Sequence, residues 1–260
     1  MKKMIIHCGI ITFILSSIIH TTNTYFIPGR EMFYLATKDD VKANFDETVE
    51  RLIKDRSVYE EAAHNTDPYL RYLSIAQRHS IDPSEGRVIF AKNHLSTIQV
   101  YPHINQFILY LDHEFVDKRH GARLDFLIAH ELSHYKQELE TYSLTQTNIH
   151  SPFQQVFNKL PNWVTKSIDC YYQRQNEFDA DLRAVLLLKS KKAAIVWIKG
   201  SIAFKKTIQI SDKKTRASLP NVKEKIKFSC HQFLNRTIFS THPSPQARIR
   251  FLNKHASHLD

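Results

Sequence analysis

The chain has 260 residues, of which 42% are hydrophobic and 24% are charged, and these values are typical of one folded domain and exclude wholesale disorder. Five glycines are too few for a sandwich or barrel with many tight turns, so the composition favours a helix-rich fold. The formal net charge of +10 fits an anionic partner and equally fits simple solubility, so it does not identify a function.

The first 24 residues predict export. Lys2 and Lys3 precede an apolar run whose cleanest part, residues 9–19, is shorter than the roughly 20 residues that a transmembrane helix needs. This pattern is typical of a secretory signal peptide, but no A-x-A cleavage site follows, so an uncleaved signal-anchor is the alternative. We expect residues 25–260 to form a single exported domain, with no further segment apolar enough to span a bilayer.

Three cysteines bear on the redox compartment, and none belongs to a C-x-x-C pair, which excludes a thiolate zinc ribbon. Cys8 lies in the export segment. Cys170 and Cys230 would remain after its removal, either as one disulfide in an oxidising compartment or as two buried thiols. The sequence leaves both states open.

The remaining elements follow in chain order. Spaced apolar residues predict a helix at about 39–54, and Asp67 followed by Pro68 predicts the start of a second one. Three stretches rich in β-branched and aromatic residues then predict a small antiparallel sheet of about three strands, at 87–91, 97–102 and 106–116. Long helices at about 118–139 and 162–188, and two or three further helices, complete an α+β fold that is predominantly helical.

The first chemical motif is H-E-x-x-H, formed by His130, Glu131 and His134 in the helix at 118–139. Positions i and i+4 of a helix point the same way, so the two histidines can offer their imidazoles to one metal ion. Glu131 lies about 100° round the helix, where it can take a proton from a metal-activated water. Chance gives this motif in roughly one of 25 such sequences, so two surface histidines on an amphipathic helix remain the alternative.

A second pair of helix positions supports the metal interpretation. Glu177 and Asp181 are again i and i+4, on the helix at 162–188. Glu177 can supply a third ligand, and Asp181 can accept the ring N–H of a ligating histidine and so determine its tautomer. A solvated acidic face is the alternative, but the same helix is basic upstream, at Lys166 and Arg174, and apolar downstream.

The third segment, S-T-H-P-S-P-Q-A-R-I-R-F-L at 240–252, is by itself only a turn that enters a helix, with His242 near its start and Arg248 as an ordinary helix residue. Taken together, the three segments resemble the M48 family of metallopeptidases, which includes the HtpX-like and Ste24-like enzymes. The matching stretches are A-H-E-L-S-H at 129–134, E-F-D-A-D at 177–181 for the family's E-x-E-A-D, and T-H-P-S-P-Q-A-R-I at 241–249 for its T-H-P-x-x-x-x-R-I. The resemblance covers roughly residues 65–255.

This resemblance implies a zincin-type domain of the gluzincin class and a zinc-dependent endopeptidase with one Zn²⁺ per chain. His130, His134 and Glu177 would be the zinc ligands, and Glu131 would be the general base. Asp181 would support a ligand histidine, and Arg248 would lie near the active site.

In the same resemblance, His242 would be a catalytic residue that stabilises an oxyanion. Asp179 departs from the family pattern because it is shorter than the expected glutamate. The multi-span membrane bundle of some members is missing, which points to a resemblance to the smaller exported members, the periplasmic quality-control proteases. The expected location is therefore the periplasm, either free or anchored in the membrane and facing it.

Two other functions stay open: a chaperone-like or partner-binding module that retains the zinc site with little turnover, and a zinc hydrolase of a non-peptide bond. For the protease, we expect protein or peptide substrates that add as a strand to a sheet edge within 106–116, although this stretch also fits a core strand. The loop expected at 140–160 is a candidate lid by its position alone.

The basic stretch at 189–227 holds twelve Lys or Arg and only two acidic residues. It is either a docking surface for an anionic membrane or an acidic partner, or a solvated face. No nucleic-acid motif is visible, so no nucleic-acid partner is expected. The oligomeric state has no signature in the sequence.

Overall fold

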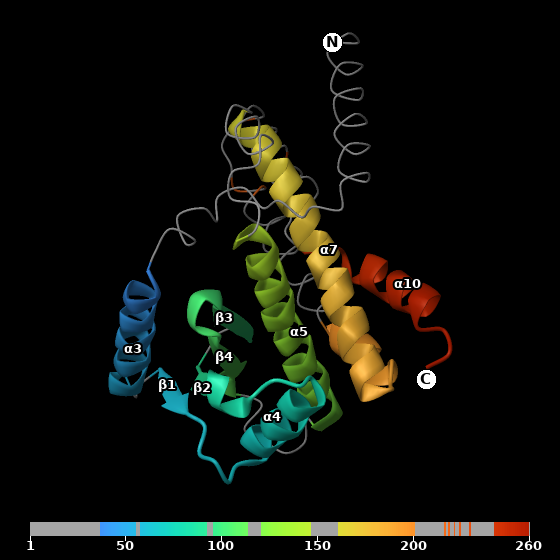
Figure 1. The fold of residues 1–260 in the computed structure, drawn as a ribbon. Helices are drawn as coiled ribbons and strands as arrows, with labels where there is room; N and C mark the ends of the chain where they lie inside the picture. Colours follow the sequence, from blue (N-terminus) through green and yellow to red (C-terminus); the bar gives the residue numbers. More distant parts are fainter. Residues whose placement is uncertain are drawn as a thin grey trace.

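The computed structural model describes residues 37–55, 58–92, 96–113, 121–146, 161–200 and 242–259, with isolated positions between 216 and 229. The predicted export segment and most of the basic stretch at 189–227 lie outside these residues. In chain order the main elements are α3 (Lys38–Lys54), β1 (Tyr59–Glu61), α4 (Asp67–Arg78), η1 (Pro83–Glu85), β2 (Gly86–Ala91), β3 (Thr97–Tyr101), η2 (Pro102–Ile104), β4 (Gln106–Asp112), α5 (Gly121–Gln146), α7 (Asn162–Leu188) and α10 (Pro245–His255) (Figure 1).

Within the described residues, four strands form one mixed sheet in the order β1-β2-β4-β3. β1 and β2 are antiparallel, as are β3 and β4, but β2 runs parallel to β4. The predicted α+β fold with a small sheet before the motif helix is therefore confirmed, while its purely antiparallel pairing is wrong. The turn η2 makes β3 and β4 a hairpin, whereas the direction of β2 against β4 depends on long-range packing, which a local pattern does not encode.

Successive residues of β2 and β4 point to opposite faces of the sheet, and each face is covered by a hydrophobic core. Ile89 and Ile108 belong to a small core with the buried residues of α3 on one face. α3 itself begins with a capping box between Thr37 and Asp40. On the other face the strands pack against α4 and α5 in the main core, which α7 joins by packing on α5, and their residues in this core are Val88, Phe90, Phe107, Leu109 and Leu111.

The two long helices α5 and α7 lie side by side and carry the predicted motifs (Figure 1). α10 packs on α7, where the rings of Phe178 and Phe251 are 4.8 Å apart. The prediction of a loop at 140–160 is wrong for residues 140–146, because α5 continues to Gln146. There the ring of Tyr142 lies 4.7 Å from that of His103, which extends the packed face of the helix, and residues 147–160 lie outside the described part.

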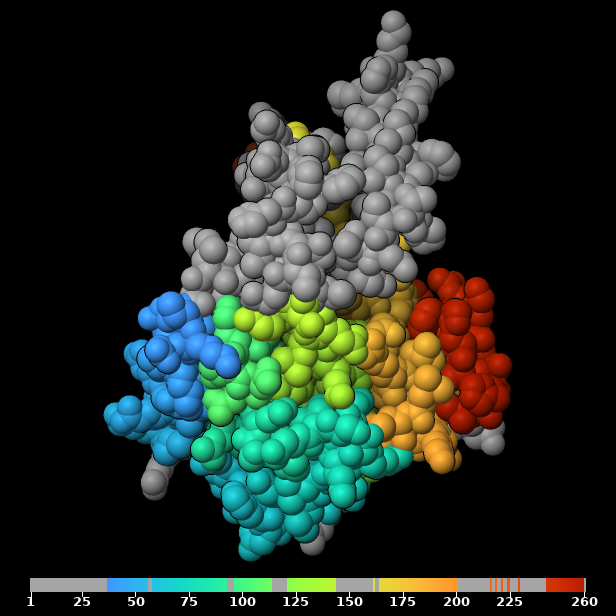
Figure 2. Space-filling view, viewed as in Figure 1, coloured from blue at the N-terminus to red at the C-terminus, as the bar shows by residue number. Residues whose placement is uncertain are grey.

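β4 is an interior strand, so the expectation of a substrate-binding edge within 106–116 is wrong. β4 is buried on both faces, and such a strand is most stable between two others. The edge next to it is β3, which also contacts α5. In the face shown in Figure 2, α3 and α10 lie on opposite flanks with α4, α5 and α7 between them. None of the helices in the described ranges is long and apolar enough to cross a membrane.

Cys170 is a buried thiol on α7, and Cys230 lies outside the described residues. The disulfide between them therefore remains an untested alternative.

The close approach of Gly86 to the core gives a stability prediction. A Cβ at this position would lie 2.4 Å from the Phe107 ring and 2.4 Å from the Tyr72 hydroxyl, and both side chains are fully buried. We expect Gly86→Ala to lower the free energy of unfolding by about 1–3 kcal/mol through overpacking. Urea unfolding of the purified protein measures this.

Gly200 provides the matched control, because it is an exposed helical glycine at which an added Cβ meets nothing within 4 Å. Gly200→Ala should leave the stability unchanged or raise it by up to about 1 kcal/mol. Equal unfolding midpoints for the two variants would contradict the packing described around Gly86.

Candidate metal centre

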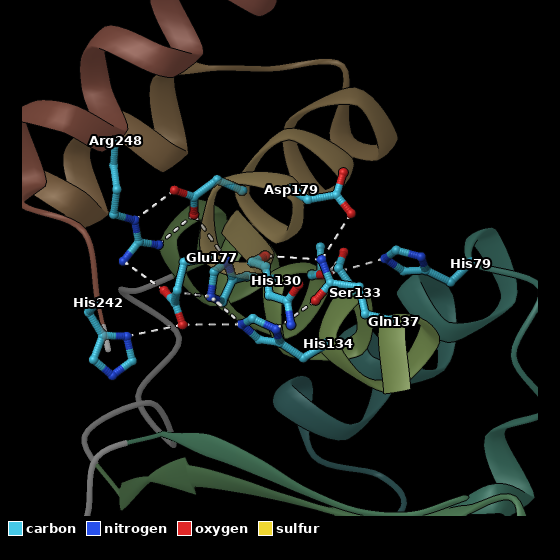
Figure 3. A network of polar contacts seen from close by, with 12 residues as sticks. His79, His130, Ser133, His134, Gln137, Glu177, Asp179, His242 and Arg248 are labelled. Atoms are coloured by element: carbon cyan, nitrogen blue, oxygen red, sulfur yellow. Dashed lines mark hydrogen bonds and ion pairs between the residues drawn. The ribbon is translucent and has the colours of Figure 1, made fainter. Parts of the chain in front are cut away.

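The predicted site residues come together where α5, α7 and the start of α10 meet (Figure 3). His130, Glu131 and His134 belong to α5, and Glu177 projects from α7 toward the two histidines. All but His134 have less than a tenth of their surface exposed, and His134 is half-buried. The site is therefore built on helices that are themselves packed in the main core.

Three potential ligand groups converge at this point. The Nε2 atoms of His130 and His134 are 3.2 Å apart, and Glu177 Oε1 lies 3.4 Å from His134 Nε2. Glu177 Oε2 lies 3.8 Å from His130 Nε2. One donor atom from each of the three residues falls within 4.8 Å of the others, which is close enough for all three to hold one metal ion.

The outer nitrogen of His130 faces a buried carboxylate. His130 Nδ1 lies 3.0 Å from Asp181 Oδ1, and Asp181 is fully buried on α7. Arg248 of α10 donates from its Nε to Asp181 Oδ2 at 2.6 Å and from a second nitrogen to Oδ1. Although burial opposes ionisation, the bonds from Arg248 and His130 lower the pKa of Asp181. Asp181 is therefore an anion that orients His130.

The outer nitrogen of His134 faces a neutral amide instead. His134 Nδ1 lies 2.9 Å from Gln137 Oε1, one helical turn further along α5. The amide nitrogen of Gln137 donates to the backbone oxygen of Asn176 at 3.0 Å and to Asp179 Oδ2 at 2.9 Å. The Nδ1 atoms of His130 and His134 thus point away from the centre of the ligand cluster, whereas their Nε2 atoms point toward it.

Glu177 receives contacts from two further residues. His242 Nδ1 lies 3.0 Å from Glu177 Oε1, and Arg248 reaches Oε2 at 3.4 Å. Burial disfavours the charge on Glu177, but its bonds to His134 and His242 outweigh this and hold its pKa well below the usual range for a carboxyl. Conversely, Glu177 and Glu131 raise the pKa of His134 to about 9 against the effect of burial, so metal binding at His134 requires loss of a proton.

Glu131 is the buried carboxyl next to the three ligand groups. Burial raises its pKa, and His130 and His134 partly counteract this. A carboxylate with a raised pKa and an adjacent metal site is suited to accept a proton during a reaction.

The backbone of the motif helix α5 is held in place at Ala129, the residue before His130. The Ala129 carbonyl oxygen accepts from the hydroxyl of Ser133 at 2.7 Å and lies 3.2 Å from Nε2 of His79, the residue directly after α4. Burial lowers the pKa of His79 to about 4, so this ring is neutral at neutral pH. α4 thereby braces the turn of α5 that precedes His130.

The residues present fit a zinc ion. Two imidazole nitrogens and one carboxylate are the donor set of catalytic zinc sites that keep a position open for water. Both histidines have an outer-nitrogen partner, which zinc-ligating histidines almost always have. The set contains no thiolate and too few oxygens for a calcium site.

Sequence reasoning missed Gln137 and the contacts of Asp179. The departure from the family pattern at Asp179 is a structural feature here, because Asp179 accepts from Gln137 and from Arg183 Nε at 2.7 Å. The spacing of Gln137, three residues after His134, was the available signal, since i and i+3 are neighbours on a helix.

The contacts of Arg248 give a stability prediction. Its removal would leave the carboxylates of Asp181 and Glu177 buried without their guanidinium partner. We expect Arg248→Met to lower the free energy of unfolding of the zinc-free protein by about 3 kcal/mol or more, because an unpaired buried charge is costly. Chemical denaturation measures this, with Arg250→Met as the control on the exposed side of α10, where the change should stay within about 0.5 kcal/mol. A comparable loss in both variants would argue against the burial of the pair.

Comparison with known proteins bears on this arrangement. The model of peptidase family M48 matches residues 109–256, which is more than half of the chain and includes the three potential ligands together with Glu131, Asp181, His242 and Arg248. Searches of curated proteins and of solved structures found no significant match. With the motif helix, the third-ligand helix and the T-H-P segment all inside the matched region, the chain belongs to peptidase family M48, a family of zinc-dependent metallopeptidases.

Proposed function

We propose that this protein is an exported zinc-dependent endopeptidase that cleaves peptide bonds in unfolded or extended proteins. The observation that carries the proposal is the convergence of His130, His134 and Glu177 beside the buried carboxyl of Glu131. Family membership supports metallopeptidase chemistry in general, and the site residues support where in this chain that chemistry takes place.

The proposed roles follow from geometry. His130, His134 and Glu177 hold the zinc ion, which when bound acidifies a water and polarises the scissile carbonyl. Glu131 takes the proton of the attacking water and passes it to the departing amine, and its raised pKa helps it to hold that proton between the two events. Asp181 and Arg248 keep His130 and Glu177 oriented.

His242 is proposed to stabilise the oxyanion that develops on the substrate. Its side chain is 65% exposed, although its Nδ1 lies 3.0 Å from Glu177 Oε1. It therefore stands at the open side of the ligand cluster, where a substrate carbonyl can approach, and an imidazole N–H is a suitable donor.

The proposed binding mode for substrates is strand addition at β3. β3 pairs only with β4 among the described residues, and it lies beside the motif helix. An extended peptide that pairs with the outer edge of β3 would run past the site, and only unfolded or loop-like segments adopt this conformation readily. A protease of this kind suits quality control in the cell envelope.

Export and membrane contact rest on the sequence. The basic, then apolar, start of the chain supports transport to the periplasm, with the segment at 1–24 cleaved or kept as an anchor. The basic stretch at 189–227 supports contact with an anionic membrane surface. Subcellular fractionation with mass determination of the mature N-terminus tests this, and recovery of intact protein from the cytoplasm would contradict export.

The role of Glu131 gives the direct test of the function. We expect Glu131→Gln to bind zinc stoichiometrically but to cleave casein at least about 100-fold more slowly, because general-base catalysis contributes on the order of 10²- to 10⁴-fold. A chelator should abolish wild-type cleavage, and added zinc should restore it. Metal content and casein cleavage are measured side by side.

The exposed Glu47 on α3 offers the matched control, since Glu47→Gln removes the same charge far from the site and should leave cleavage unchanged. Cleavage that survives in Glu131→Gln would refute the proposed mechanism. Zinc binding without cleavage of casein in wild type would favour the alternative of a chaperone-like or partner-binding module.

A further inference from the structure

We propose that Gln137 is a positioning residue that determines which ring nitrogen of His134 is available to the metal. This inference rests on the proposed function only in taking His134 as a metal ligand. It assigns a role to a residue outside the three recognised motifs, and it includes Asp179, which accepts from the Gln137 amide.

The orientation of the Gln137 amide follows from its partners. Its Nε2 faces two groups that can only accept, the backbone oxygen of Asn176 at 3.0 Å and the carboxylate of Asp179 at 2.9 Å. A reversed amide would place an oxygen against these two acceptors, which is unfavourable. Gln137 must therefore direct its Oε1 toward His134.

The orientation of the amide then decides the proton on His134. Oε1 is an acceptor, so the facing Nδ1 of His134, 2.9 Å away, must carry a hydrogen. In the neutral ring the lone pair is then on Nε2, the atom that lies 3.2 Å from His130 Nε2 and 3.4 Å from Glu177 Oε1. Gln137 thus selects the tautomer whose lone pair points into the ligand cluster.

Burial and neighbouring side chains hold the Gln137 amide in this orientation. Its side chain is buried, with 7% of its surface exposed, so water cannot easily replace its bonds. Asp179 is itself held by Arg183, whose Nε donates to it at 2.7 Å and whose other nitrogens donate to Glu140 at 2.8 and 3.0 Å. A chain of contacts from α5 to α7 and back to α5 therefore ends on the metal-facing histidine, and Figure 3 shows its last part, from Asp179 through Gln137 to His134.

The two ligand histidines are consequently supported by different chemistry. His130 faces the anion Asp181, and His134 faces a neutral amide. A neutral acceptor selects the tautomer without adding another negative charge beside the carboxyl groups of Glu131, Glu177 and Asp181. Loss of such an outer partner typically weakens metal affinity by about 10- to 100-fold.

The experiment compares zinc affinity in wild type and in a variant that removes the acceptor. Gln137→Met keeps the length and apolar volume of the side chain but removes the acceptor, and we expect its zinc dissociation constant to rise about 10- to 100-fold.

Zinc affinity is measured by competition with a chromophoric chelator, which needs no catalytic activity. The second readout is the Nδ1 proton of His134 in zinc-loaded, ¹⁵N-histidine-labelled protein, which should exchange with water faster in Gln137→Met than in wild type. Gln173→Met is the matched control, because Gln173 is also a helical glutamine and is half-buried, but it bonds to Asp169, away from the site. It should leave both readouts unchanged.

The outcomes separate this inference from the proposed function. If Gln137→Met, folded by circular dichroism, binds zinc as tightly as wild type, or if the Nδ1 proton of His134 exchanges no faster in it, the role of Gln137 is refuted. If wild type binds no zinc, or if His134→Ala binds it equally well, the proposed metal centre fails instead. Weak zinc binding and faster exchange of the His134 Nδ1 proton in Gln137→Met, with both readouts unchanged in Gln173→Met, support the inference.

Discussion

The burial of two carboxylates on one face of α7 is the constraint on which the rest of the site depends. Glu177 and Asp181 lie one helical turn apart, and both are almost completely removed from water. An isolated buried carboxylate is strongly unfavourable, so each needs hydrogen-bond donors or cations around it. Here the donors come from α5 through the two motif histidines, and from α10 through Arg248.

This requirement ties three helices together across long stretches of sequence. Arg248 bonds to both carboxylates, so α10 is attached to α7 by charge as well as by the contact between Phe178 and Phe251. The same bonds hold the ligand groups in place before any metal arrives. A preformed arrangement reduces the ordering that metal binding has to bring about, and it directs the Nε2 atoms of both histidines to one point.

The sheet has a different part in the architecture. One face of the sheet supports α5 through a core in which the rings of Phe107 and Tyr135 are 4.5 Å apart, and α3 packs on the other face. Because β4 occupies the interior, β3 becomes the edge that lies beside the motif helix. Strand order, rather than the composition of either strand, therefore decides which strand lies at this edge of the sheet.

Much of this protein follows from local patterns in the sequence. The helix at 162–188 was predictable in both bounds, and the family was predictable from three short segments, because motif spacing on a helix determines which side chains share a face. Glu131, His130, His134, Glu177 and Asp181 could all be named from such spacing.

The tertiary structure alone decided the features that depend on contacts between distant segments. The parallel pairing of β2 with β4 and the edge position of β3 have no local signature, and β1 is too short and polar to leave one. The contact of Gln137 with Asp179 joins residues 42 positions apart. Helical periodicity tells which residues face the same way, whereas the identity of the residue they meet depends on how two helices pack.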